Sequence, residues 1–441
     1  MQNDLTTGSV FRNVVSFSLP YLLSYFLQTL YGMADLFIIG QLEGVASTTA
    51  VSIGSQVMHM LTVMLVSLAM GATVSIAQAA GGGDKKRTAS AIGNTVTLFM
   101  LLSLALTALL LALRGGIVSI MSTPEEAVQG TLAYLTVCFI GIPFITAYNI
   151  IASIFRGLGD SKNPMYFIAV ACVVNIALDY YFMGTLHLGP AGAALGTTLS
   201  QAVSVLVSLA VILKRRLISV RRADFRPQRA VMGKLLQIGV PVALQDGFIQ
   251  VSFVIITIIA NRRGLTDAAA VGIVEKIIGF LFLIPSSMLS TVSALGAQNI
   301  GAGKPERARL TLRYAAMIAC SFGIAVVILT LFIAEPLVGL FTPDDAVAAA
   351  GGQYLRGYIW DSFFAGVQFS FSGYFCACGK SVLSFLHNII AIVLVRIPGV
   401  YLTSLWFPDT LFPMGIATAC GSLTSVVICL FVFRYLKRKA S

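Results

Sequence analysis

Apolar residues fill long stretches of the chain, and polar residues gather in the short intervals between them. Twelve such stretches are about 20 residues long or longer, the length that an α-helix needs to cross a bilayer. Apolar and polar residues do not alternate strictly within them, so they predict helices rather than the strands of a membrane barrel. The predicted spans are residues 14–40, 47–78, 90–113, 130–155, 164–184, 190–213, 235–260, 268–298, 310–333, 350–377, 383–405 and 413–436.

Composition indicates the same class of protein. Of the 441 residues, 57% are hydrophobic and 11% are charged, whereas about 25% of a typical soluble domain is charged. The intervals between spans are at most about 25 residues long, which leaves no room for a soluble catalytic domain. The three histidines are isolated, and the seven cysteines lie in or beside spans without disulfide or zinc spacing. We therefore expect neither enzyme activity nor a cofactor.

The distribution of Lys and Arg predicts the orientation. With the N-terminus inside, 23 of the 29 basic residues fall in cytoplasmic segments and four in outer segments, as the positive-inside rule requires. The net charge of +11 is spread over the inner loops, so it indicates topology rather than nucleic-acid binding. No N-x-S/T sequon occurs. We expect a multi-pass protein of the plasma (inner) membrane with both termini in the cytoplasm.

The chain contains an internal repeat. AQAAGGGDKKR at 77–87 and AQNIGAGKPER at 297–307 share five identical positions at an offset of 220 residues. Other pairs follow this offset within one residue, namely Pro20 and Pro241, Thr123 and Thr342, Gly159 and Gly379, and Tyr181 and Tyr401. Six spans per repeat is an even number, so the repeats should be related by an axis along the membrane normal, with a cleft between them. The predicted domains are an N-terminal lobe, 1–213, a basic linker, 214–234, and a C-terminal lobe, 235–441.

Three motifs carry a family resemblance. ADLFIIGQLEG at 34–44, AQAAGGGD at 77–84 and FRGLGDSKNPM at 155–165 resemble the hallmarks of the multidrug and toxic compound extrusion (MATE) family, and the likeness covers the whole chain. The resemblance implies an all-α membrane fold of two six-helix bundles in a V around a central cleft. It also implies export of amphipathic, often cationic, compounds, driven by inward movement of H⁺ or Na⁺. The expected partners are these small molecules and membrane lipid, and we expect a monomer.

A carboxylate in the first span points to this activity. Asp35 lies in an otherwise apolar helix, with Tyr31, Gln28 and Ser24 on the same face. An ionised side chain at the centre of a bilayer costs about 2.5–3.5 kcal/mol on insertion scales, so such residues face the bundle interior or a wet cavity. We interpret the four residues as part of the lining of an N-lobe cavity. The alternative is a protonated Asp35 that is hydrogen-bonded within helix packing.

A second acid lies at a compatible depth in the fifth span. Asn175 and Asp179 are one helical turn apart, and no basic residue lies in the middle of any N-terminal span. Two unpaired buried carboxylates need a cation, either a shared proton or Na⁺, which prefers oxygen ligands. The hydroxyl of Thr197 in the sixth span is a further ligand, and Asn149 in the fourth is a plausible fifth member. The set Asp35, Asn175, Asp179 and Thr197 also resembles the cation site of family members with an N-lobe site.

The C-terminal half contains both acids and bases within its spans. They are Asp246, Glu275, Lys276, Asp361 and Arg396, and Asp246 shares its helix face with Gln250. We interpret these residues as a self-neutralised interhelical network. The alternative is that Asp246 or Asp361 attracts a cationic substrate. The stretch SGYFCACGKS at 372–381 resembles a phosphate loop, but Tyr374 replaces the required glycine, so ATP hydrolysis is not supported.

One other transport function competes with drug export. A lipid-linked oligosaccharide flippase of a related superfold would have the same number of spans. It would need arginines in the cleft to bind a pyrophosphate, and the N-terminal lobe supplies none there.

Overall fold

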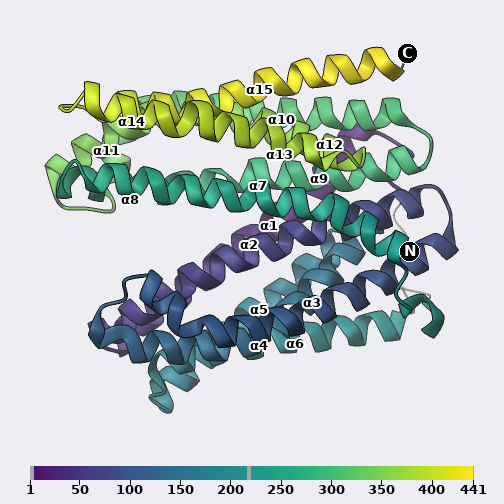
Figure 1. Ribbon diagram of the computed structural model, residues 1–441, viewed down its shortest axis with the longest axis horizontal. Coiled ribbons are helices and arrows are strands. Elements are labelled where there is room, and N and C mark those ends of the chain that lie inside the picture. Colours follow the sequence, from purple (N-terminus) through teal and green to yellow (C-terminus); the bar gives the residue numbers. More distant parts are fainter. Residues whose placement is uncertain (1–3, 216–219, 441) are drawn as a thin grey trace. The chain divides into compact units, whose positions relative to one another are not determined.

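The protein is all-helical in the computed structural model, which describes residues 4–215 and 220–440 (Figure 1). The elements of the N-terminal repeat are α1 (Val10–Leu42), α2 (Val45–Gly81), α3 (Lys85–Ile120), α4 (Glu125–Gly157), α5 (Lys162–Asp179), the π-helix η1 (Tyr180–Thr185) and α6 (Gly189–Arg215). A 3₁₀-helix, η2 (Arg222–Phe225), precedes the second repeat. The C-terminal elements are α7 (Arg229–Asn261), α8 (Leu265–Leu281), α9 (Leu283–Gly301), α10 (Pro305–Gly339), α11 (Asp345–Tyr358), α12 (Trp360–Ala377), α13 (Ser381–Ala391), the π-helix η3 (Ile392–Arg396), α14 (Ile397–Trp406) and α15 (Phe412–Ala440).

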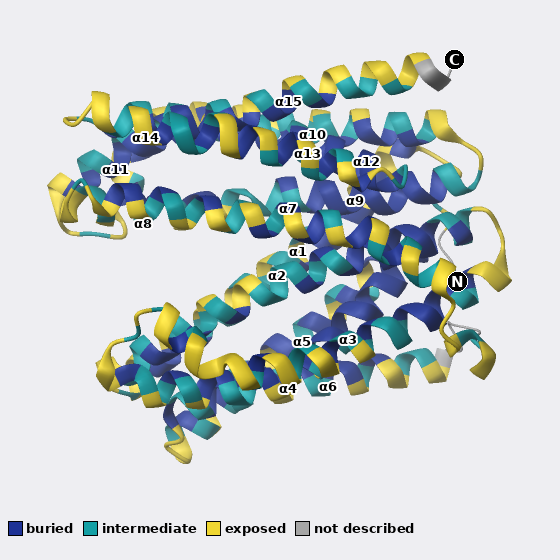
Figure 2. Cartoon of the chain, viewed as in Figure 1, coloured by how far each residue is buried: buried dark blue, intermediate teal, exposed yellow. Residues whose placement is uncertain are grey.

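The predicted helical spans are confirmed as helices. Among the described residues, 11 helical segments are long and apolar enough to cross a membrane. The predicted span 350–377 is not one of them, because the helix is interrupted at Ile359 and its second part, α12, carries buried Ser and Gln side chains. Large apolar side chains such as Leu104 and Leu329 are exposed, and exposed faces recur along the helices (Figure 2). Such faces suit contact with lipid, as expected of a multi-pass membrane protein.

The sequence repeat has a counterpart in the backbone of the loops. Gly83 and Gly303 both have a φ of +71°, and Gly159 and Gly379 have φ of +89° and +71°. Each glycine follows the end of a helix, where a left-handed residue allows the chain to turn away while the last carbonyls remain hydrogen-bonded. The amide nitrogens of Asp84 and the residue after Gly303 bond back to carbonyls five positions earlier, at 3.2 and 2.8 Å. The repeated motif therefore encodes the same helix ending twice.

The chain divides into two compact units, and the division falls inside two helices. Leu19–Val240 belong to the first unit, and Thr6–Ser18 belong to the second with the residues from Pro241 onward. The divided helices α1 and α7 carry Pro20 and Pro241 at these points. A proline inside a helix removes a backbone hydrogen bond and favours a bend. These units assign residues 6–18 and 235–240 differently from the predicted lobes.

In the first unit, α4 is the central helix and packs against α2, α3 and α6. Close approach depends on small residues: a β-carbon on Gly141 of α4 would lie 2.5 Å from Oγ1 of Thr198 on α6. Part of the predicted linker, residues 216–219, lies outside the described residues. Its later part forms η2, whose Asp224 and Phe225 carbonyls accept hydrogen bonds from Asn94 and Thr97 of α3.

Two helices change from α to π geometry in the middle of their course. In the first unit α5 passes into η1 directly after Asp179, and in the second unit α13 passes into η3, which ends at Arg396. A π-turn inserts an extra residue into the helix and often marks a functional position. Both π-helices adjoin a buried charged residue.

Candidate cation site in the first unit

Asp35 is buried in the first unit and is bonded to a different helix. Its side chain is on α1, and its Oδ2 accepts a hydrogen bond of 2.9 Å from Oγ1 of Thr197 on α6. Asp35 lies seven residues before the end of α1, and Thr197 lies eight residues after the start of α6. These positions correspond to roughly 10–12 Å from the same end of the unit. Residues 162 apart in the sequence thus meet at one depth.

Asp179 and Asn175 complete this group of polar side chains. Both are on α5 and both are fully buried, at 0% exposure. The carboxyl group of Asp35 interacts with the side chains of Asp179 and Asn175 as well as with Thr197. The structure therefore brings together the four residues of the candidate cation site, Asp35, Asn175, Asp179 and Thr197.

Gly196 leaves the space that the Asp179 carboxyl group occupies. A β-carbon on Gly196 of α6 would lie only 2.0 Å from Oδ1 of Asp179. Any other residue at position 196 would displace the carboxyl group or push the two helices apart. The sequence Gly196-Thr197 therefore provides both the space for one acid and the hydroxyl donor for the other.

Several oxygen atoms of this group have no hydrogen-bond partner among the described residues. They are Oδ1 of Asp35, Oδ1 of Asn175 and both carboxyl oxygens of Asp179. Buried polar atoms in proteins are almost always bonded, and unpaired buried carboxylates are especially costly. With the hydroxyl of Thr197, the group offers a set of oxygen donors suited to a proton or to a hard cation such as Na⁺.

The buried basic residue Arg156 lies far from the two acids. It is the penultimate residue of α4, and its guanidinium lies 4.0 Å from the centre of the Tyr21 ring. Tyr21 precedes Asp35 by 14 residues on α1, which is about 20 Å along the helix. Arg156 cannot neutralise Asp35 from that position.

The other predicted lining residues have different surroundings. The Ser24 hydroxyl donates to the Pro20 carbonyl of its own helix at 2.8 Å. Gln28 and Tyr31 are partly buried, and Tyr31 packs against the core of α4 and α5. Asn149 is buried and donates from Nδ2 to the Ile145 carbonyl at 2.9 Å. None of these four makes a recorded hydrogen bond to Asp35 or Asp179 within the described ranges.

Three residues of α4 near this group were not predicted. Tyr134 and Cys138 are buried and within electrostatic range of Asp35, and Tyr148 interacts with Gln28. Tyr134, Cys138 and Tyr148 follow one another at helical spacing, so the stripe was visible in the sequence. It was not singled out because aromatic residues and Cys at this spacing are usually core residues.

The second unit contains a separate buried group of charges. Glu275 on α8 and Asp361 on α12 both interact with Arg396 at the end of η3. Lys276 is exposed, because neighbouring residues of a helix point about 100° apart and Glu275 takes the inward position. The membership of Lys276 in an interhelical network stays a prediction. Asp246 and Gln250 are partly buried on α7, and Asp246 lies within electrostatic range of Cys376 on α12.

Comparisons with known proteins agree with the fold and the repeat. The MatE family profile matches residues 20–181 and again residues 241–402. A probable multidrug resistance protein, YpnP of Bacillus subtilis, is 30% identical over 99% of this chain and 98% of its own length. The multidrug export protein MepA of Staphylococcus aureus is 24% identical over 87% of this chain and 86% of its own. A crystal structure of a MATE protein in complex with MaL6 superposes with a TM-score of 0.91 at 23% identity, covering 99% of both chains. The family profile, matched twice, and the full-length relatives show that this chain belongs to the MATE family of multidrug transporters, which are not enzymes.

Proposed function

We propose that the protein is a secondary antiporter that exports amphipathic, cationic organic compounds in exchange for H⁺ or Na⁺. The coupling cation binds in the first unit between Asp35 and Asp179. The observation that carries this proposal is the pair of buried carboxyl groups with unpaired oxygens and no basic side chain beside them among the described residues. Transport follows an alternating-access cycle in which this centre is loaded from one side of the membrane and emptied to the other.

The residues of the centre have distinct tasks. A bound cation supplies the positive charge that allows two carboxylates to remain buried side by side. Asp35 and Asp179 hold that charge, and the Thr197 hydroxyl fixes the orientation of the Asp35 carboxyl group. Asn175 contributes an oxygen that matters for Na⁺ but does not titrate. Without the cation the two carboxylates repel each other, so loss of the cation favours a rearrangement of α1 against α5 and α6.

The substrate class rests on the relatives and on this charge arrangement. Relatives that cover most of the chain are named as multidrug resistance or export proteins, which supports drug export over the flippase alternative. The two acids give the first unit a negative charge that an organic cation can also neutralise. Competition between substrate and coupling ion for that charge would make their movements mutually exclusive.

Transport by the purified full chain in proteoliposomes tests this function. An outward-directed gradient of a fluorescent organic cation is combined with a pH jump or with a Na⁺ jump at constant pH. We expect one of the two jumps to accelerate substrate movement, and that result identifies the coupling ion. Glu126→Gln, which changes an exposed acid at the start of α4, is the matched control. Substrate movement that responds to neither gradient would contradict the proposal.

A further inference from the structure

Arg396 is a permanent cation that the second unit holds in its interior. It is 5% exposed, and its Nη2 donates to the Tyr358 hydroxyl at 2.7 Å. The guanidinium carbon lies 5.2 Å from the centre of the Phe253 ring and 5.7 Å from that of Tyr358. Aromatic faces at such distances stabilise a cation without water. Arg396 is thus held in its charged form by residues of α7 and α11.

Two acids share the surroundings of this guanidinium. Nη2 of Arg396 is 3.9 Å from Oδ2 of Asp361, which is fully buried. Glu275 interacts with Arg396 and accepts a hydrogen bond of 3.1 Å from Thr257 on α7. The group has two carboxyl groups, as the first unit has, but also contains a fixed positive charge.

The repeat relates this group to the cation site of the first unit. The pairs Gly159 and Gly379, and Tyr181 and Tyr401, flank this helix at an offset of 220 residues, which pairs Arg396 with Ile176, the residue after Asn175. Asn175 and Arg396 both lie on the helix that changes to π geometry in their repeat. The charged side chain beside the π-helix also lies against a glycine of the last helix in each repeat. A β-carbon on Gly421 would lie 2.8 Å from Cβ of Arg396, as one on Gly196 would touch Asp179.

We propose that Arg396 is a built-in counter-cation that closes the second unit to exchangeable metal cations. The first unit has a neutral amide, Asn175, beside its two carboxyl groups, whereas the second unit has a guanidinium beside its two. Arg396 thereby restricts Na⁺ binding to a single centre in each chain. Replacement of its charge opens a second alkali-cation site formed by Asp361 and Glu275.

The charge balance explains why a metal ion is excluded and a proton is not. Two carboxylates and one guanidinium leave one negative charge. A single proton on either carboxyl group neutralises it without entering the space around Arg396. A metal ion would have to lie beside the guanidinium, which repels it at short distance in a medium of low dielectric constant.

Equilibrium binding of radioactive sodium to the purified full chain at alkaline pH tests this assignment. The starting protein is Asp35→Asn, Asp179→Asn, which removes the centre in the first unit. We expect no bound sodium in this background, one sodium per chain after addition of Arg396→Gln, and none again when Asp361→Asn is added. Arg396→Lys, which retains the charge, is the matched control and should bind none.

The outcomes separate this inference from the proposed function. A difference in bound sodium between the wild type and the starting protein reports only on the cation site of the first unit. Sodium that remains bound to the starting protein and disappears with Asp361→Asn would overturn the role of Arg396, as would a monodisperse Arg396→Gln variant that gains no sodium. A second experiment measures sodium binding to the Asp361→Asn variant of the wild-type protein, in which Arg396 is unchanged. We expect it to leave the sodium stoichiometry unchanged, and a loss of one sodium would overturn the inference.

Discussion

Gly196 and Asp179 are in such close contact that a β-carbon on the glycine would lie 2.0 Å from the carboxyl oxygen Oδ1. The contact joins α6 to the last residue of α5, at the point where that helix becomes a π-helix. The backbone of α6 at Gly196 thereby limits where the Asp179 carboxyl group of the candidate cation site can lie. A change at this glycine therefore tests the site without altering any group that binds the cation.

Gly196→Ala should impair ion-coupled efflux while the protein still folds. The added methyl group forces the Asp179 carboxyl group or α6 to move, and overpacking of this kind costs about 1–3 kcal/mol. If that cost falls on the cation-bound state, affinity for the coupling ion falls roughly ten- to a hundredfold. The measurement is the ion concentration that gives half-maximal efflux in proteoliposomes. Gly116→Ala, where a β-carbon meets no atom within 4 Å, is the control, and equal behaviour of the two variants would contradict this role for Gly196.

Thr197→Val should distinguish the two candidate coupling ions. The substitution retains the shape of the side chain and removes the hydroxyl that donates to Asp35 at 2.9 Å. If Na⁺ is coupled, Na⁺-driven efflux should fall severely, because the site loses one of the oxygen ligands that Na⁺ prefers. If H⁺ is coupled, the effect should be mild because threonine does not titrate. Asn175→Ala should follow the same pattern, and Thr197→Ser should restore transport in either case.

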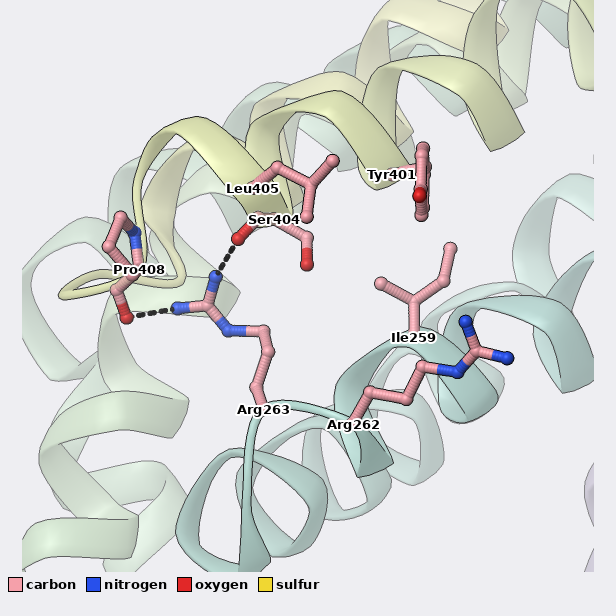
Figure 3. A pocket seen from close by; sticks show the side chains of 7 residues that line it. All are labelled: Ile259, Arg262, Arg263, Tyr401, Ser404, Leu405 and Pro408. Carbon is pink, nitrogen blue, oxygen red and sulfur yellow. Dashed lines mark hydrogen bonds between the residues drawn. The ribbon is translucent and has the colours of Figure 1, made fainter.

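Arg263 should be a stability determinant of the second unit. Its Nε lies 2.7 Å from Oδ2 of Asp267, and its terminal nitrogens donate to carbonyls in the last turn of α14 and in the loop that follows, including those of Ser404 and Pro408 at 2.8 and 2.7 Å (Figure 3). These bonds satisfy carbonyl groups that the end of α14 leaves without helical partners. We expect Arg263→Ala to destabilise the second unit, which has about 200 residues, by about 2 kcal/mol, which corresponds to a fall of roughly 4–8 °C in the temperature at which that unit unfolds.

The neighbouring Arg262 provides the control for that measurement. It is exposed, and Arg262 and Arg263 both line a pocket of about 370 Å³ (Figure 3). Arg262→Ala should change the unfolding temperature by less than about 2 °C, as exposed substitutions usually do. Equal effects of Arg262→Ala and Arg263→Ala in a thermal unfolding assay would show that the carbonyl bonds are unimportant.

The orientation in the membrane can be measured with single cysteines. Position 226 follows η2 in the basic segment and is exposed, and position 125 is exposed at the start of α4. In a background without native cysteines, Arg226→Cys should react with an impermeant thiol reagent only after the cells are opened. Glu125→Cys should react in intact cells. The reverse pattern would overturn the cytoplasmic assignment of the termini.

The sequence was sufficient to predict the helices, the repeat and the four residues of the candidate cation site. An isolated carboxylate in an apolar helix has few stable environments, so Asp35 and Asp179 stand out without any structure. A comparison of depths related Asp35 to Asp179, whereas Thr197 was predicted from its hydroxyl oxygen and from the resemblance to the family's cation site. The glycine turns could also be matched, because Gly83 and Gly303 must adopt the same left-handed backbone.

Other features depend on tertiary packing, which a linear pattern does not express. The contribution of Gly196 is visible only when α5 and α6 are packed together, since a glycine in an apolar helix has many possible reasons. Ile359, where the helix is interrupted, and Tyr180, where the π-helix begins, are neither proline nor glycine. A position within a predicted span does not show which side of the helix faces the interior, since Glu275 is partly buried and the adjacent Lys276 is exposed. The direction in which a side chain leaves the helix, rather than its place in the sequence, decides whether it is buried.

The most direct test of the account is ion-driven efflux by the Asp35→Asn, Asp179→Asn double variant. The substitutions retain size and hydrogen-bonding capacity but remove both buried charges of the candidate cation site. In proteoliposomes with equal amounts of folded protein, efflux driven by the coupling-ion gradient should fall to the level of protein-free vesicles, while Glu126→Gln remains at the wild-type rate. Wild-type ion-driven efflux by the double variant would contradict the central claim, and Asp35 and Asp179 would then be packing residues.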